Sequence, residues 1–525
     1  LFRSFLLGRV QILEHGGQLG VHIKETYIGL YAQDAWRITD RVTVNAGLRW
    51  EPFLGQSIID GGIANFSRDN FNKGVKSSVF TQAPAGFLYP GDSAYPDGNS
   101  GFEKQWLNIS PRGGIAWDVS GNGRTAVRAS YGLAYDFPVG ETWFTLSAAP
   151  PYAVRLRVLD PPGRMDDPYA PGGDPNPIVV GKNSTFPAFA TFSAVDPKIN
   201  SPRVQQWNLT VEREIGSQWG VSASYLGSYS DRLWGDVSQN PGVFLGLDPC
   251  TINGVSYPVC STAANLNNRR VLSLANPREG GYVADLELLD DFGTQSYRGL
   301  KVSGQRRAAG GLSINGNYTW SRCFGLEMSN SGPTPGSGVT NPADPDFDRG
   351  HCSQDRTHLA NLTLGAETPR FASIALRALA SGWRASGIVS ARSGGWLNIV
   401  TGVDTALNSV SNQRVNQVSD DVYGVKTVNK FLNREAFATP APGTLGNYIR
   451  NSVRGPGFWK VDLALSRLFA LGRAQQVEAR LEVFNLLNNF NWGDPVASFN
   501  NANFGKVQTQ VGDMRILQFG VKYAF

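Results

Sequence analysis

Four histidines and four cysteines are the residues of this chain that most readily bind metal ions or act as nucleophiles. No spacing between the two types matches a metal site, and the neighbours His351 and Cys352 are interpreted as ordinary loop sequence. A GxSxG nucleophile elbow or a phosphate-binding glycine loop in a strand–turn–helix context is also missing. The sequence therefore predicts a protein that is not an enzyme and has no cofactor. The histidines are His15, His22, His351 and His358.

Alternating aspartates form a second group with chemical potential. Asp344, Asp346 and Asp348 occur in the run DPDFD, and Asp355 follows. Oxygen ligands at this spacing can hold calcium, but Arg349 occupies the position where a calcium loop needs glycine for its sharp turn. The sequence favours a solvated acidic loop over a calcium site, and we expect no metal.

The four cysteines fall into two local groups. One group is Cys250 with Cys260, and the other is Cys323 with Cys352. An even number of cysteines in a non-cytosolic protein is compatible with two loop disulfides, and free thiols are the alternative.

The C-terminal stretch 514–525 indicates which elements carry these residues. It reads MRILQFGVKYAF, and every second residue counted from the end is apolar. A period of two is typical of a strand with one apolar face. Such a strand closes an outer-membrane β-barrel or ends a soluble β-sandwich. Its apolar residues are Leu517, Phe519, Val521, Tyr523 and Phe525.

The composition excludes several classes of protein. Charged residues make up 17% and aromatic residues 11% of the 525 residues, and there are 60 glycines, which is unlike a helical protein. No run approaches the roughly 18 apolar residues that a membrane helix needs, so only a closed barrel would span a bilayer. The formal net charge is +5 and the basic residues are scattered, so we expect no nucleic-acid partner.

Strand-like runs recur along the whole chain in pairs. Short turns and long Gly-, Pro- and Asn-rich loops alternate between them, which is typical of an outer-membrane barrel. We predict an all-β transmembrane antiparallel barrel with about thirteen strands, or fourteen if 4–13 is one, with short periplasmic turns and long extracellular loops. The predicted pairs lie in 26–53, 108–119 with 124–137, 204–214 with 220–230, 296–307 with 312–322, 358–366 with 383–392, and 458–469 with 475–487, before the terminal strand.

Charged residues on the polar faces of these runs would line the lumen of such a barrel. We expect them to meet water or a plug rather than to form a substrate site. They are Arg49, Glu51, Arg128, Lys460, Asp462, Glu478, Arg480 and Glu482.

Several stretches resemble TonB-dependent outer-membrane receptors, specifically the Oar-like group with a carboxypeptidase-regulatory-like domain. They follow one another in order over nearly the whole chain. They include YAQDAWRITDRVTVNAGLRWEPF (31–53), GNGRTAVRASYGLAYD (121–136), QQWNLTVEREI (205–215), DRTHLANLTLGAETP (355–369), GWRASGIVSARSGGW (382–396), RNSVRGPGFWKVDLALSRLF (450–469) and EARLEVFNLLNNFNWG (478–493).

The resemblance implies energised uptake of a large solute across the bacterial outer membrane. It implies a barrel of about 22 strands around an N-terminal plug. The implied partners are outer-membrane lipid, the TonB motor acting through the plug, the barrel-assembly machinery reading the terminal strand, and an unidentified solute.

No stretch of 1–525 reads as a plug, and the chain begins at Leu1 without a signal peptide. We therefore expect 1–525 to be the C-terminal part of a longer barrel, as a fragment or a processed piece. Two alternatives remain open: a passive porin-like channel of fourteen strands, and a barrel whose long loops bind a surface or partner. The sequence does not predict the solute.

Overall fold

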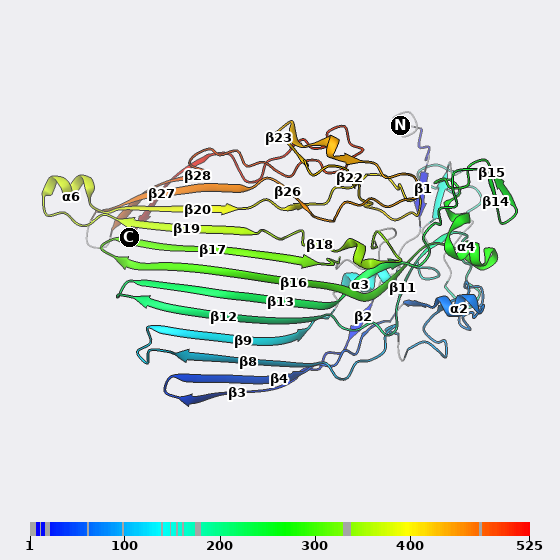
Figure 1. Ribbon diagram of the computed structural model, residues 1–525, viewed down its shortest axis with the longest axis horizontal. Coiled ribbons are helices and arrows are strands. Elements are labelled where there is room, and N and C mark those ends of the chain that lie inside the picture. Colours follow the sequence, from blue (N-terminus) through cyan, green and yellow to red (C-terminus); the bar gives the residue numbers. More distant parts are fainter. Residues whose placement is uncertain are drawn as a thin grey trace.

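The computed structural model describes residues 1–525 except 1–6, 11, 16–21, 60–61, 97–98, 138–139, 148, 154–155, 160–161, 174–179, 329–337 and 472–474. Its main feature is a curved antiparallel sheet of long strands (Figure 1). Thirteen strands follow one another in chain order: β3 (Leu30–Thr39), β4 (Val42–Trp50), β8 (Ile109–Asp118), β9 (Thr125–Tyr135), β12 (Arg203–Ile215), β13 (Trp219–Ser238), β16 (Val283–Ala309), β17 (Leu312–Gly325), β19 (His358–Glu367), β20 (Trp383–Arg392), β27 (Phe458–Ala470), β28 (Gln476–Phe484) and β29 (Ile516–Ala524).

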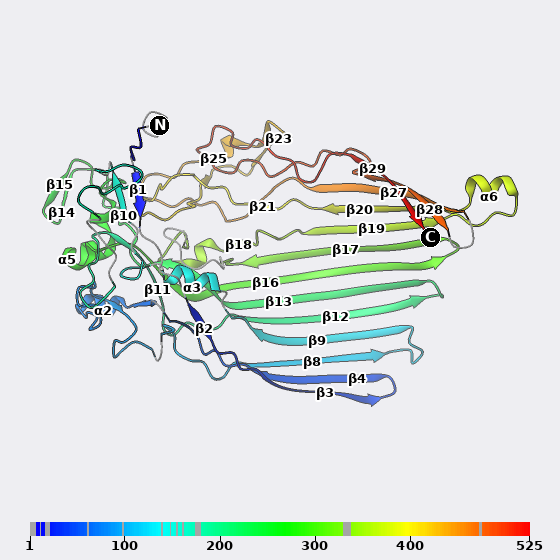
Figure 2. The same ribbon diagram turned by 180° about the vertical axis from the view of Figure 1, so that it is seen from behind.

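Each of these strands pairs antiparallel with the next one in the series. The series begins with β3 and ends with β29. Figures 1 and 2 show β3 and the strands β27–β29 at opposite edges of the sheet. The thirteen strands predicted from alternation are therefore present in the predicted order.

The two ends of the sheet differ in their connections. Five of the connections at one end are short, and the turn between β16 and β17 consists of Gly310 and Gly311. Both glycines have positive φ, 61° and 79°, as a two-residue hairpin turn that matches the strand twist requires. The connection between β19 and β20 is longer and holds the helix α6 (Ile374–Ala380), which projects beyond the strand ends (Figure 2). Long loops join the strands at the opposite end, called the loop end below.

The register places apolar side chains together on one face of the sheet. Leu209, Tyr225, Leu300 and Trp320 are successive partners across β12, β13, β16 and β17. All four are large and remain exposed, between 42% and 57%. An apolar face of this extent is stable only against lipid or another protein. We call it the outer face, and the opposite face the inner face.

The buried hydrophobic residues gather in the loops and at the loop ends of the strands. One cluster joins Phe66 and Phe87 to Phe192 and Leu286, and a second packs Phe53, Phe102, Trp143 and Trp234 together. A third lies between the β20–β27 and β28–β29 loops and includes Val415, Phe437 and Tyr448. The long loops therefore contain small cores and short elements.

The short strands serve these cores. β11 (Ala190–Val195) runs parallel to the first part of β16 and to β6 (Ala64–Phe66), which extends the sheet at the loop end. The other short strands are β1 (Ile12–His15), β2 (Ile23–Glu25), β5 (Gln56–Ile58), β7 (Phe87–Leu88), β10 (Leu156–Leu159), β14 (Cys250–Ile252), β15 (Val255–Tyr257), β18 (Gly350–His351), β21 (Trp396–Leu397), β22 (Asn416–Gln417), β23 (Tyr423–Thr427), β24 (Lys430–Leu432), β25 (Phe437–Ala438) and β26 (Val453–Arg454).

The helices in the described part of the chain are all short. Besides α6 they are α2 (Arg68–Asn72), α3 (Gly140–Leu146), α4 (Val271–Ala275), α5 (Pro277–Gly280), η1 (Leu266–Arg269), η2 (Pro345–Asp348) and η3 (Arg434–Ala436). Among the described residues, none of these helices has the length and apolar character needed to cross a membrane.

The possible fourteenth strand over 4–13 is not part of the large sheet as far as it is described. Residues 4–6 and 11 lie outside the described residues. The described strand in this region is β1 (Ile12–His15), which pairs with β10 in a separate two-stranded sheet.

Candidate functional site

The inner face of the sheet is polar on the same four strands. Thr210, Ser224, Lys301 and Thr319 are successive partners across β12, β13, β16 and β17. Thr210 donates a hydrogen bond to Ser224, with 2.9 Å between the hydroxyl oxygens. Hydroxyl and amide groups on such a face bond to one another or to water, so this face suits the wall of a hydrated space.

Arg49 and Glu51 lie at the loop end of β4. The Arg49 Nε is 2.7 Å from the Glu51 Oε2, and the Tyr27 hydroxyl donates to the same oxygen at 2.7 Å. The Ser110 hydroxyl on β8 donates to the other Glu51 oxygen at 3.3 Å. Glu51 is buried, so its charge is held by these three donors and is not presented to solvent.

The other charged residues predicted for the lumen also have oppositely charged neighbours on the inner face. Arg128 lies 3.3 Å from Glu212 on the neighbouring strand β12. Lys460 and Asp462 approach to 2.7 Å, and Arg480 and Glu482 approach to 2.6 Å. Glu478 is the register partner of Lys522. The charges are thus arranged as local pairs and do not converge on one point, as an active site would require.

The terminal residues lie on β29 or directly after it, at the edge of the sheet. Leu517, Phe519, Val521 and Tyr523 alternate along the strand, and Phe525 follows it. All are exposed, from 50% for Tyr523 to 92% for Phe525. The register pairs Leu517 with Val483 and Phe519 with Leu481, so the apolar residues of β29 continue the outer face.

Both cysteine groups form disulfides at the loop end. Cys250 bonds to Cys260 across the hairpin of β14 and β15, with a sequence separation of 10. Cys323 on β17 bonds to Cys352 just after β18, with a separation of 29. The bond between Cys323 and Cys352 holds the later part of the 326–357 loop against the end of β17, the strand from which this loop starts.

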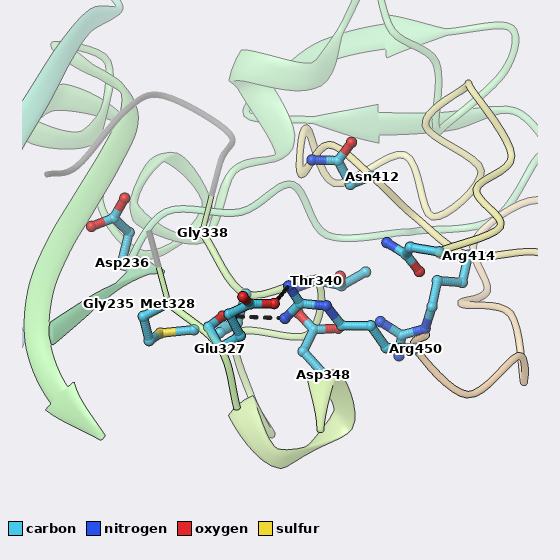
Figure 3. Close-up of a pocket in the computed structure, with 12 residues that line it drawn as sticks. Gly235, Asp236, Glu327, Met328, Gly338, Thr340, Asp348, Asn412, Arg414 and Arg450 are labelled. Carbon is cyan, nitrogen blue, oxygen red and sulfur yellow. Dashed lines mark hydrogen bonds and ion pairs between the residues drawn. The ribbon is translucent and has the colours of Figure 1, made fainter. Parts of the chain in front are cut away.

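A cavity of about 170 Å³ opens among the loops at this end of the molecule (Figure 3). Figure 3 shows Asp236 at one side of it and Arg450 at the other. The end of β13 and the β17–β19 and β20–β27 connections meet here. The lining residues are Gly235, Asp236, Glu327, Met328, Gly338, Val339, Thr340, Asp348, Asn398, Asn412, Arg414 and Arg450.

Arg414 is the most constrained of the charged groups in this cavity. It is 2% exposed and pairs with Asp348, which is also buried. It also donates to the carbonyl of Phe347 at 2.7 Å and to that of Tyr448 at 2.8 Å. A buried guanidinium that is fully bonded in this way holds three loop segments in one arrangement.

Arg450 and Glu327 are less completely bound. Arg450 donates to the Glu327 carbonyl at 3.2 Å, and the two charged groups are 3.7 Å apart. Ser353 donates to Glu327 through its backbone N–H and its hydroxyl. The buried Asn398 Oδ1 has no hydrogen-bond partner among the described residues. The cavity therefore presents an acidic group, a basic group and an amide oxygen to a polar ligand.

The expected solvated acidic loop is wrong for two of its four aspartates. Asp348 is buried against Arg414, and buried Asp355 accepts from the Cys323 backbone N–H at 3.0 Å and from the Trp396 indole at 2.8 Å. Asp346 is exposed and lies 3.4 Å from Arg349. These carboxylates are bound by protein donors that local spacing does not reveal. Within the described parts of the chain, no histidine, cysteine and acidic side chains group as metal ligands.

Sequence reasoning did not find the cavity. Asp236, Glu327, Arg414 and Arg450 are distributed over more than 200 positions, and none stands in a recognisable motif. Only the pairing of the strands brings their loops together, so no local signal could have marked them.

Comparison with known proteins gives one family match. Residues 1–518 match the family described as "Outer membrane beta barrel domain". No curated protein matches the chain.

Several solved structures are similar. The outer membrane transporter YddB from Escherichia coli has a TM-score of 0.46 and 10% identity, covering 97% of this chain and 45% of that one. The FrpB iron transporter from Neisseria meningitidis (F3-3 variant) has a TM-score of 0.42 and 11% identity, covering 95% and 45%. The siderophore receptor PiuA from Acinetobacter baumannii has a TM-score of 0.40 and 11% identity, covering 94% and 42%. The chain spans less than half the length of each of these proteins.

Proposed function

Because this chain belongs to the outer membrane β-barrel domain family, and is therefore a protein of the bacterial outer membrane, we propose that it forms the barrel wall of a TonB-dependent receptor of the Oar-like group. In this proposal it contributes to energised uptake of a large solute. The plug and the contact with the TonB motor belong to the rest of the receptor, of which 1–525 is the C-terminal part.

The observation that carries the proposal is the opposition of the two faces of the sheet. The outer face is apolar and exposed, whereas the inner face carries hydroxyls and locally paired charges such as Arg128 with Glu212. A hydrated wall whose charges are paired locally does not bind ions strongly at one point. Such a wall suits the passage of a bulky solute or contact with a plug.

The loop end supports the same proposal. The long loops hold small hydrophobic cores, two disulfides and the cavity of Arg414 and Arg450. A folded loop end keeps a polar opening in a fixed shape above the wall, as capture of a solute from outside requires. Acidic and basic groups both line this opening.

A deletion strain provides the test. The full reading frame that contains this chain is deleted, and the large solutes left in a defined medium are compared with those left by the parent strain. We expect at least one large solute to remain in the medium of the deletion strain. The parent strain should also leave this solute in the medium when a proton uncoupler removes the energy source. Uptake that persists with the uncoupler would contradict energised transport.

The passive-channel alternative is separated by a second measurement on the same full protein. A steady open conductance in planar bilayers, together with an upstream reading frame that lacks a plug-sized domain, would favour a channel. A closed protein that conducts only after removal of an upstream domain supports the receptor.

A further inference from the structure

Two arginines face each other on the outer face of the sheet. Arg298 on β16 and Arg322 on β17 are direct register partners, and both are exposed. They are two residues along their strands from Leu300 and Trp320, which belong to the outer face, so their side chains leave the sheet on the same side. Like charges directly opposite in an antiparallel pair are unfavourable unless an anion lies between them.

The described residues supply no anion for this pair. Neither guanidinium forms a salt bridge with a described carboxylate, whereas Arg306, the next arginine on the same face of β16, donates to the Leu312 carbonyl at 2.6 Å and to the Gln218 side chain at 3.1 Å. The Arg322 guanidinium lies over the Phe324 ring, 5.2 Å from its centroid, which leaves its edge open.

The position of the pair coincides with a membrane boundary. Between Arg298 and Arg306 the outer face of β16 carries Leu300, Val302 and Gly304. Eight residues of strand rise about 26 Å, and the apolar band of an outer-membrane barrel is about 25 Å tall. On β16, Arg298 therefore marks the edge of the apolar band at the loop end, and Arg306 marks the opposite edge. Trp320 lies beside the pair, as expected of an interfacial aromatic.

An aromatic ring and a further arginine lie along the strands on either side of the pair. The neighbour of Arg298 on β13 is Gly227, and the Trp207 ring lies across this glycine, so close that a Cβ there would be 2.2 Å from it. The Trp207 indole therefore flanks Arg298 on this side, as an aromatic at a membrane interface does. Four residues along β16 from Arg298, toward the loop end, Thr294 accepts a hydrogen bond from Arg349 at 2.7 Å, and Arg349 is itself paired with Asp346.

We propose that Arg298 and Arg322 bind the phosphate of an anionic lipid headgroup in the outer leaflet of the outer membrane. Guanidinium groups bind phosphate oxygens bidentately, and a phosphate between the two arginines would relieve their repulsion. The proposal rests on the membrane assignment alone, so it is independent of the transport function.

The test measures lipid binding to the full-length protein purified in detergent, by native mass spectrometry. The probes are lipid A, which carries phosphates, and phosphatidylethanolamine, which is zwitterionic. We expect retention of lipid A in preference to phosphatidylethanolamine, and a loss of about tenfold or more in lipid A binding for R298Q/R322Q. The double variant R298K/R322K keeps the charges and should retain part of the binding.

The matched control is R128Q, which removes one arginine charge from the inner face and should leave lipid A binding unchanged. Heat-modifiable electrophoretic mobility checks that each variant is folded. Equal binding of the two lipids, or full lipid A binding by folded R298Q/R322Q, would overturn the proposal. Displacement of lipid A by inorganic phosphate would show a site for free anions and would also overturn it.

Discussion

At the scale of single residues, the buried pair of Arg414 and Asp348 controls how the loops assemble. Arg414→Met removes the cation but leaves Asp348 buried with a single described donor, the Thr340 backbone N–H at 2.6 Å. Removal of one partner of a buried pair costs about 3–5 kcal/mol. We expect the loop end of the Arg414→Met variant to unfold at a lower urea concentration than that of the unaltered protein. Tryptophan fluorescence measures this unfolding.

The control for this prediction is an exposed pair. Arg384 and Glu367 approach to 2.9 Å, but both side chains are more than half exposed, so Arg384→Met should cost less than about 1 kcal/mol. The double variant R414M/D348N removes the unpaired charge and should recover much of the loss. Equal effects of R414M and R384M would show that the buried pair has no special role.

His351 gives the loop end a dependence on pH. Its ring stacks on Trp396 with 3.8 Å between centroids, and burial, together with the nearby charge of Arg322, lowers its pKa below its usual value of 6.5. A histidine with a lowered pKa binds fewer protons when folded than when unfolded. Its contribution to stability is complete above pH about 6.5 and is lost as the pH falls from there through the lowered pKa.

We expect protease resistance of the loop end to fall as the pH is lowered from about 6.5 to about 5, and His351→Gln to weaken this dependence. His358→Gln, on the outer face beside Tyr318, serves as the control and should leave the dependence unchanged. A pH profile that is identical in H351Q and the unaltered protein would exclude His351 as its source.

At the scale of elements, alternation predicted the strands well where both faces keep a constant environment. β12 shows the pattern throughout, with Leu209 and Val211 on the outer face and Thr210 and Glu212 on the inner face. β13 continues beyond the predicted end at 230, where register shifts interrupt the pairing and Arg232 has a φ of 57°. A bulge of this kind breaks the period of two, so the strand beyond it cannot be recognised from sequence.

The loop end was less predictable for a related reason. Phe66, Phe87 and Phe192 lie on strands of six residues or fewer, and each strand is too short to show a period. Their cluster forms only because β6 and β11 run parallel to each other, with β11 paired to the first part of β16. The same long-range assembly creates the cavity, so its residues carried no local signal.

The terminal strand makes an element-scale prediction about assembly. β29 pairs with β28 on one side, and Tyr523 and Phe525 extend its apolar row to the end of the chain. If the barrel-assembly machinery reads this row, Y523S/F525S should reduce the heat-modifiable protein in the outer-membrane fraction several-fold. Q518S/K522S changes the polar row of the same strand and should have little effect. Similar losses in both variants would point to general weakening of β29.

At the scale of the whole molecule, the direction of the strands determines how the sheet can close. Thirteen strands joined antiparallel leave β3 and β29 running in the same direction, from the loop end to the short-turn end. Direct closure would therefore need a parallel pair, whereas bacterial single-chain barrels have an even number of antiparallel strands. Open edges in lipid would leave backbone groups without partners, which costs several kcal/mol for each group.

We therefore expect β29 and β3 to pair with strands outside the series β3–β29, and cysteine cross-linking of the full-length protein in membranes can test this. The four native cysteines are already joined in two disulfides, so they do not interfere. E478C/K522C joins register partners on β28 and β29 and should cross-link efficiently. Q33C/Q518C, on the polar rows of β3 and β29, should not. Efficient cross-linking of that second pair would show a thirteen-strand barrel closed by parallel strands, and it would remove the physical argument that this wall needs further strands to enclose a passage.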